Sequence, residues 1–88
     1  MIKETLTLNN KTGLHARPAS AIAKIVGKCQ SKVEFISRDK VIKGKSVIGL
    51  MTAGITGGAK VEVICEGTDE EAVFLEIKAL FSAGFGEE

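Results

Sequence analysis

The stretch TGLHARPAS, residues 12–20, contains the only histidine and the only proline of the chain. An imidazole is substantially neutral near pH 7 and can then act as a nucleophile. Pro18 fits the first turn of a helix, where its missing N–H is not needed. The backbone amides of Ala16 and Arg17 at that helix end lack intrahelical acceptors and point toward any anion placed there. The residues around His15 therefore predict a phosphate-binding helix end with a nucleophilic nitrogen beside it.

Two further residues of the stretch fit this chemistry. Arg17 offers a planar guanidinium suited to phosphate oxygens. Gly13 lets the loop turn where a side chain would block the approach of a ligand. No carboxylate or second histidine lies close in sequence to serve as a hydrolytic base, which favours a carrier of a phosphoryl group over a hydrolase. From these residues alone, an inert or helix-capping His15 stays an equal alternative.

The elements that must position this site follow from the hydrophobic pattern. Alternating or short apolar runs predict strands over 2–8, 32–37, 40–43 and 60–67. Apolar residues at helical spacing predict helices over 17–28 and over the VIGLM segment after Ser46. A third helix is predicted from about residue 70, with Thr68 or Asp69 as its N-cap. The order β-α-β-β-α-β-α predicts an α+β fold, an open-faced β-sandwich with a four-stranded antiparallel sheet and three helices on one face. We expect residues 1–88 to form one domain, with Phe35, Phe74 and Phe81 in its core and Phe85 packed back or frayed.

Composition excludes several other classes of protein. The apolar runs are too short to span a bilayer, and the N-terminus lacks the pattern of a signal peptide, so we expect a cytoplasmic protein without membrane insertion. Cys29 and Cys65 are far apart and form no metal-ligand motif. We expect both thiols to be reduced, Cys65 as a small buried residue, in a monomer that needs neither a metal nor a cofactor.

Charge is distributed unevenly along the chain. Residues 1–60 hold eleven of the twelve Lys and Arg residues but only three of the eleven Asp and Glu residues. This split indicates one basic and one acidic surface, which would steer charged partners. An acidic last helix that only keeps the chain soluble is an equal alternative.

A second candidate site lies at Ser46. As a helix N-cap, this serine would contribute about 1 kcal/mol to a short helix. The helix after it is more apolar than a short solvent-facing helix requires, so we expect at least one of Val47, Ile48 and Met51 to lie outside and form a docking patch. Lys24, Lys28 and Lys45 would rim that patch and favour acidic partners.

The segment GLHARPAS, together with GKSVIGLMTAGI thirty residues further on, resembles the HPr family of histidine-containing phosphocarriers. This family belongs to the bacterial phosphoenolpyruvate-dependent sugar phosphotransferase system, and the resemblance covers essentially the whole chain. It implies that His15 accepts a phosphoryl group on Nδ1 from phospho-Enzyme I and passes it to the A component of a sugar permease. It also implies that Arg17 contacts the phosphate, and that the apolar patch docks both partners.

For Ser46, the resemblance implies phosphorylation by a regulatory kinase/phosphorylase, as in many family members, and an effect on a catabolite-control transcription factor. The chain departs from the family pattern at Ile48, where methionine is frequent, and at Thr52-Ala53, where serine-leucine is frequent. These departures leave the identity of the partners open, including a role mainly in regulation.

Two other functions are weaker hypotheses. A purely regulatory protein acting through Ser46 alone would not need His15, since regulatory relatives lack the active histidine. The sequence argues against a nucleic-acid-binding domain that stacks on bases. The chain has four Phe, no Tyr and no Trp, and no strand motif that combines aromatic and basic residues.

Overall fold

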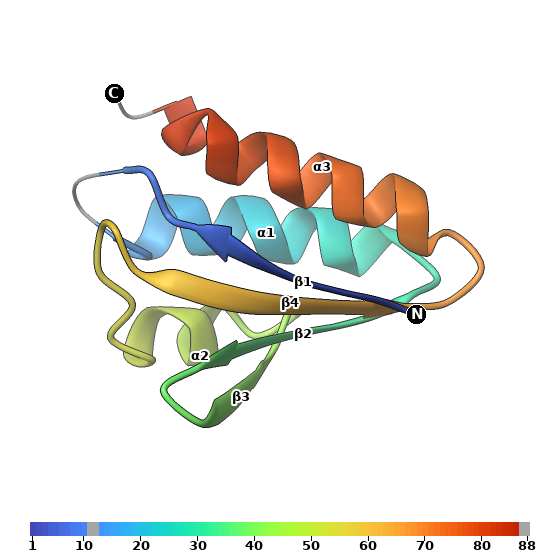
Figure 1. Ribbon diagram of the computed structural model, residues 1–88, viewed down its shortest axis with the longest axis horizontal. Coiled ribbons are helices and arrows are strands. Elements are labelled where there is room, and N and C mark those ends of the chain that lie inside the picture. The colour runs from blue at the N-terminus through green and yellow to red at the C-terminus, as the bar shows by residue number, and fades with distance from the viewer. Residues whose placement is uncertain (11–12, 87–88) are drawn as a thin grey trace.

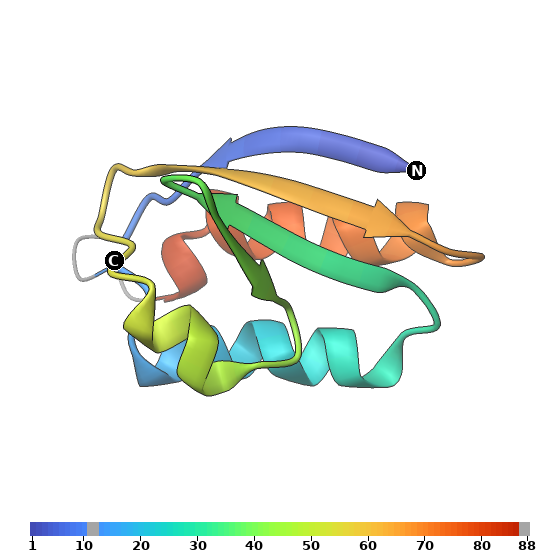
Figure 2. The same ribbon diagram turned by 90° about the horizontal axis from the view of Figure 1, so that it is seen from below.

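A computed structural model describes residues 1–10 and 13–86 of the chain (Figures 1 and 2). Its elements are β1 (Ile2–Thr7), α1 (Ala16–Lys28), β2 (Lys32–Ser37), β3 (Lys40–Lys43), α2 (Val47–Thr52), β4 (Lys60–Glu66), α3 (Glu70–Ser82) and a short 3₁₀ turn, η1 (Gly84–Gly86). The strands form one antiparallel sheet in the order β1-β4-β2-β3. Figure 2 shows all three helices on one side of this sheet. The predicted open-faced α+β sandwich is therefore confirmed.

Alternating residues along the strands build the core. Leu6 pairs with Val61, and Val63 of β4 pairs with Phe35 of β2, so that their side chains share the face that the helices cover. The helices complete this core with fully buried apolar residues, among them Ile22, Val26, Leu50, Ile77 and Phe81. The core thus runs continuously from the sheet into the stripes of all three helices, and this packing fixes how the helix ends are placed.

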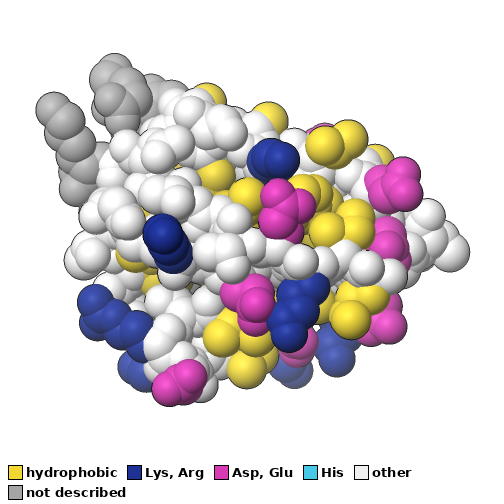
Figure 3. Space-filling view, in the orientation of Figure 1, with side chains coloured by type: hydrophobic (Ala, Val, Ile, Leu, Met, Phe, Trp, Pro, Cys, Tyr) yellow, Lys and Arg dark blue, Asp and Glu magenta, His cyan; other side chains and the backbone are white. Residues whose placement is uncertain are grey.

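The other face of the sheet has no covering helix. Ile36 and Val41 lie opposite each other there, and Val41 is 61% exposed. Charged residues surround them, including the ion pair of Lys3 and Glu62 at 3.9 Å. Figure 3 shows this face, with hydrophobic side chains scattered between basic and acidic ones.

β4 ends at Glu66, one residue before the predicted end, and α3 begins after Asp69, which is one of the two predicted caps. Asp69 occupies the N-cap position of α3, but its side chain makes no capping hydrogen bond. Its carboxylate instead accepts hydrogen bonds from the Gln30 backbone N–H, at 2.9 Å, and from the Ser31 hydroxyl. Asp69 therefore ties the segment between α1 and β2 to the first turn of α3.

The C-terminal part of the chain folds back on the core. Phe85 is partly buried, with its ring centroid 5.3 Å from that of Phe81, so it packs back as one of the two expected alternatives. Phe35, Phe74 and Phe81 are buried as predicted. The 3₁₀ turn that holds Phe85 was not predicted, because Phe85 adopts a positive φ of 56° that a sequence pattern does not reveal.

The two cysteines are both free, as expected, and they differ in environment. Cys65 is completely buried in β4, and burial raises the pKa of its thiol to about 11. Cys29 is half-buried at the end of α1, where its Sγ donates to the carbonyls of Val26 and Ser31. In the described residues, no helix has the length and apolar character needed to cross a membrane.

The Asp69 contacts predict a specific dependence of stability on pH. The backbone N–H of Gln30, followed by the Ser31 hydroxyl, lowers the pKa of the Asp69 carboxyl. A lowered pKa in the folded state means that the stabilisation is complete above the pKa of the unfolded chain and is lost as the pH falls through the folded-state value. We expect Asp69→Asn to lower the melting temperature at pH 7 and to approach the wild type toward pH 2.

Thermal unfolding followed by circular dichroism at several pH values checks this expectation. Glu71→Gln, which alters an exposed residue in the same helical turn, is the control and should shift the melting temperature less at pH 7. A constant difference between Asp69→Asn and the wild type from pH 7 to pH 2 would show that the carboxylate does not contribute in this way.

Candidate functional site

His15 lies at the N-cap position of α1, with an extended backbone (φ −108°, ψ −163°). Its carbonyl accepts the first helical hydrogen bond, from the Ala19 N–H at 3.0 Å. Its side chain is exposed and makes no capping hydrogen bond to the helix. The backbone of His15 is therefore part of the helix start, while its side chain is accessible to solvent.

The residues just before His15 are held against a distant part of the chain. The Leu14 N–H donates to the Ile55 carbonyl at 2.9 Å, and the Leu14 side chain is buried in the core. Gly13 has a φ of +77°, and a Cβ at this position would overlap the Ile55 carbonyl oxygen and lie 2.9 Å from Thr56 Cα. Gly13 is thus needed because two backbone segments touch there, whereas the sequence suggested that it leaves room for a ligand.

The helix end next to His15 is electrostatically suited to an anion. The amides of Ala16 and Arg17 precede the first helical hydrogen bond and therefore have no acceptor inside α1, and Pro18 has no N–H. The first turn of α1 contains no acidic residue. The helix dipole and the exposed guanidinium of Arg17 add positive charge at the same end. This arrangement can bind a phosphoryl group attached to the imidazole.

Ser46 lies at the N-cap of α2, as predicted. Its hydroxyl oxygen accepts a hydrogen bond from the Gly49 N–H at 2.9 Å, and its carbonyl accepts from the Leu50 N–H at 3.0 Å. A Cβ at position 49 would lie 2.8 Å from the Ser46 Oγ, so the glycine makes room for the cap. The Ser46 side chain remains partly accessible to solvent.

The apolar residues of α2 are placed on a helix that lies beside the N-terminal half of α1. Figures 1 and 2 agree that the last turn of α2 is its end nearest to the start of α1. Leu50 is completely buried, whereas Ile48 is 75% exposed and Met51 is 43% exposed. Val47 is half-buried against the core. The expectation that at least one of these residues lies outside is thus confirmed, and the structure brings their helix close to His15.

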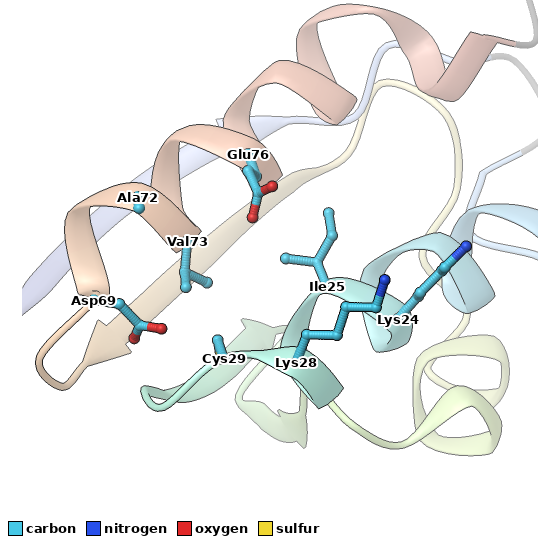
Figure 4. Close-up of a pocket in the computed structure, with 8 residues that line it drawn as sticks. All are labelled: Lys24, Ile25, Lys28, Cys29, Asp69, Ala72, Val73 and Glu76. Atoms are coloured by element: carbon cyan, nitrogen blue, oxygen red, sulfur yellow. The ribbon is translucent and has the colours of Figure 1, made fainter.

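The three lysines expected at the rim of the patch line two hollows of the surface. At 1.5 Å per residue, Lys24 and Lys28 are about 12 Å and about 18 Å along the axis of α1 from Ala16. Both line a groove of about 300 Å³ between α1 and α3, together with Asp69 and Glu76. Figure 4 shows Glu76 pointing from α3 toward the groove and the two lysine side chains along its α1 side.

Lys45 lines a separate hollow of about 410 Å³ between the end of α1 and the β2–β3 hairpin. The charge separation seen in the sequence is accordingly only partial in space. The basic helix α1 and the acidic start of α3 face each other across the groove.

The contacts that hold the segment before His15 were not predicted from the sequence. The strand predicted over 2–8 ends at Thr7, and Leu8 instead exchanges hydrogen bonds with the loop before β4, from its N–H to Ala59 and from Gly58 to its carbonyl. Asn10 is buried and donates to Gly13. An asparagine two or three residues before a glycine favours such a turn, which was the available signal.

In residues 1–10 and 13–86, no group of three His, Cys, Asp or Glu side chains is arranged to hold a metal ion.

The contact at Gly13 generates a prediction about stability. We expect Gly13→Ala to reduce the free energy of unfolding by about 2 kcal/mol, because alanine is strained at a positive φ and its methyl group meets the Ile55 backbone. Urea unfolding measures this change. The matched control is Gly27→Ala in α1, where a Cβ meets nothing within 4 Å, and it should be neutral or stabilising by about 0.5 kcal/mol. Equal effects of the two substitutions would argue against a close contact at Gly13.

Comparison with known proteins shows to which family the chain is similar. The family profile described as "PTS HPr component phosphorylation site" matches residues 2–83. Phosphocarrier protein HPr of Treponema pallidum is 33% identical over 88 residues, which cover 100% of both chains. Among solved structures, HPr-C-His from Thermoanaerobacter tengcongensis has a TM-score of 0.94 at 36% identity and covers 100% of this chain and 99% of its own.

A second group of similar structures comes from a regulatory protein. Crh of Bacillus subtilis, described as a catabolite repression protein with a swapping domain in an intertwined dimer, has a TM-score of 0.74 at 28% identity, with 96% and 97% of the two chains covered. The profile match spans both His15 and Ser46, and the full-length relative is above 30% identical. The chain belongs to the HPr family, the phosphocarrier proteins of the phosphotransferase system.

Proposed function

We propose that this chain accepts a phosphoryl group on Nδ1 of His15 from phospho-Enzyme I and transfers it to the A components of sugar permeases. The observation that carries this proposal is the position of His15. Its side chain is exposed and makes no capping hydrogen bond, and His15 directly precedes the two N-terminal amides of α1 that have no intrahelical acceptor. An inert capping histidine would direct its side chain back to those amides.

The chemistry requires an exchange of one bond to phosphorus for another. The neutral Nδ1 attacks the phosphorus, the new N–P bond forms, and the bond to Enzyme I breaks with its electron pair left on the donor. The phosphoryl oxygens bring negative charge to His15, and the amides of Ala16 and Arg17 together with the Arg17 guanidinium stabilise it. Transfer to an A component repeats the exchange in the opposite direction.

Both partners dock on the exposed residues of α2 in this proposal. Ile48 and Met51 supply the apolar centre, with Val47 at its edge, next to the start of α1. Lys24, Lys28 and Lys45 rim this patch and favour acidic partners in the proposal. The carrier acts as a monomer, which leaves this surface open to each partner in turn.

Ser46 provides a site for regulation. Its hydroxyl caps α2 and is partly exposed, so a kinase/phosphorylase could reach it. A phosphate there would add nearly two negative charges at a helix N-terminus, which tolerates them, and the fold would be kept. The added charge borders the docking residues and would weaken binding of Enzyme I. It would also create a surface that a catabolite-control transcription factor could recognise.

Phosphorylation of the purified protein tests the role of His15. Incubation with phosphoenolpyruvate and Enzyme I should add the mass of one phosphoryl group, and the adduct should be acid-labile. His15→Ala should remove the adduct completely, whereas Arg17→Lys, which keeps the charge but loses the planar guanidinium, should slow its formation. An Enzyme I preparation that labels the Treponema pallidum relative but not this chain would refute the proposed carrier role.

A separate incubation with ATP and the kinase/phosphorylase tests Ser46. We expect an acid-stable adduct that is lost in Ser46→Ala and that lowers the rate of His15 labelling. Labelling at Ser46 with no acid-labile adduct at His15 would favour the purely regulatory alternative. No adduct at Ser46 in an assay that labels another HPr would leave this serine as a helix cap.

A further inference from the structure

Asn10 is a polar residue in an unusual position, with 1% of its surface exposed. Its side-chain Nδ2 donates a hydrogen bond to the Gly13 carbonyl at 2.8 Å. A buried amide is costly unless it is hydrogen-bonded, so a side chain of this type is retained in a buried place only where its bonds matter. The acceptor of this bond belongs to the peptide that leads into the site.

The Gly13–Leu14 peptide is held from two sides. Asn10 holds its carbonyl, while the Leu14 N–H donates to the Ile55 carbonyl at 2.9 Å. Rotation of this peptide would break both bonds at once. On the other side of His15, the first helical hydrogen bond joins the His15 carbonyl to the Ala19 N–H. The backbone of His15 is thus fixed between a clamped peptide and a helix.

We propose that Asn10 is a positioning residue for phosphoryl transfer, which holds the Gly13–Leu14 peptide so that the His15 imidazole stays beside the amides of Ala16 and Arg17. This inference rests on the proposed function of His15. In this proposal Asn10 needs no contact with the phosphoryl group or with the partner. It acts through the backbone that sets where Nδ1 stands relative to the helix end.

The neighbouring asparagine shows why position 10 matters. Asn9 also donates from Nδ2 to a carbonyl, but its acceptor is Phe81 of α3, at 3.2 Å. Asn9 is exposed, and its bond joins the end of β1 to α3 rather than to the loop of the site. Asn9→Ala therefore removes a comparable hydrogen bond from an adjacent residue and is a matched control.

The experiment compares Asn10→Ala, Asn10→Leu and Asn9→Ala with the wild type. The leucine variant fills a similar volume without a donor and protects against a loss of folding through an empty space. Two readouts are used, namely the rate of His15 labelling by phospho-Enzyme I and the hydrogen exchange of the Leu14 amide. Labelling is measured over a range of carrier concentrations, so that binding and transfer are separated.

We expect both Asn10 variants to slow transfer roughly tenfold at saturating carrier, with the concentration for half-maximal rate little changed, because docking on α2 is intact. The Leu14 amide should exchange roughly tenfold faster relative to core amides of β4, since its bond to Ile55 depends on the clamped peptide. Asn9→Ala should alter neither quantity beyond its effect on overall stability.

The possible contrary outcomes are distinct. Folded Asn10 variants with wild-type transfer rates would overturn the inference, as would failure of both variants to fold, which would make Asn10 a structural residue. If the wild type itself is not labelled at His15, the proposed function fails. In that case only the hydrogen exchange of the Leu14 amide tests whether Asn10 holds the Gly13–Leu14 peptide. An unchanged exchange rate in the Asn10 variants would show that it does not.

Discussion

The rest of the site depends on a backbone contact in which a methyl group cannot fit. Gly13 and Ile55 are 42 positions apart, and a Cβ on Gly13 would overlap the Ile55 carbonyl oxygen. Through this contact the segment before α1 is bonded to the segment before β4. Because β4 is an interior strand of the sheet, this contact connects the start of α1 to the segment that leads into the middle of the sheet. The position of His15, two residues after Gly13, is therefore set by contacts with a distant segment and not only by its own loop.

This placement lets a small protein do chemistry with few groups. The helix end supplies backbone donors and a favourable dipole without any buried charge. Arg17 is on the first turn of the same helix, and α2 packs beside it with Ile48 and Met51 exposed. A partner that covers α2 would also exclude water from the imidazole. Electrostatic interactions with the phosphoryl group would then become stronger, because the local dielectric constant is lower. Recognition and transfer would then occur in one binding event.

Sequence patterns were sufficient for most of the fold. The alternation in β1 and β4 and the helical spacing in α1 and α3 correspond to faces that are buried in one core, so local pattern and tertiary packing agree. Ser46 was predicted as a cap because it directly precedes the helical VIGLM segment, and its hydrogen bond to Gly49 is local in the same way.

Features that depend on contacts between distant segments could not be predicted in the same way. Asp69 is a residue type that often caps helices. Its carboxylate instead accepts hydrogen bonds from Gln30 and Ser31, nearly forty residues earlier. Lys24 and Lys28 belong to the charge excess of the first sixty residues, but they line a groove with acidic residues of α3. The same holds for the hydrogen bonds that Asn10 and Ile55 make to the Gly13–Leu14 peptide. Neither hydrophobic periodicity nor helix-cap preferences predict them.

We propose that the N-terminal amides of α1 donate hydrogen bonds to the phosphoryl oxygens on His15 while the Gly13–Leu14 peptide and the sheet stay in place. Amide ¹H–¹⁵N spectra recorded before and after phosphorylation by Enzyme I test it most directly. The account predicts large downfield shifts of the Ala16 and Arg17 amides, with Leu14 and the strands almost unchanged. Unshifted Ala16 and Arg17 amides in a fully phosphorylated protein, or changes spread throughout β4, would contradict it.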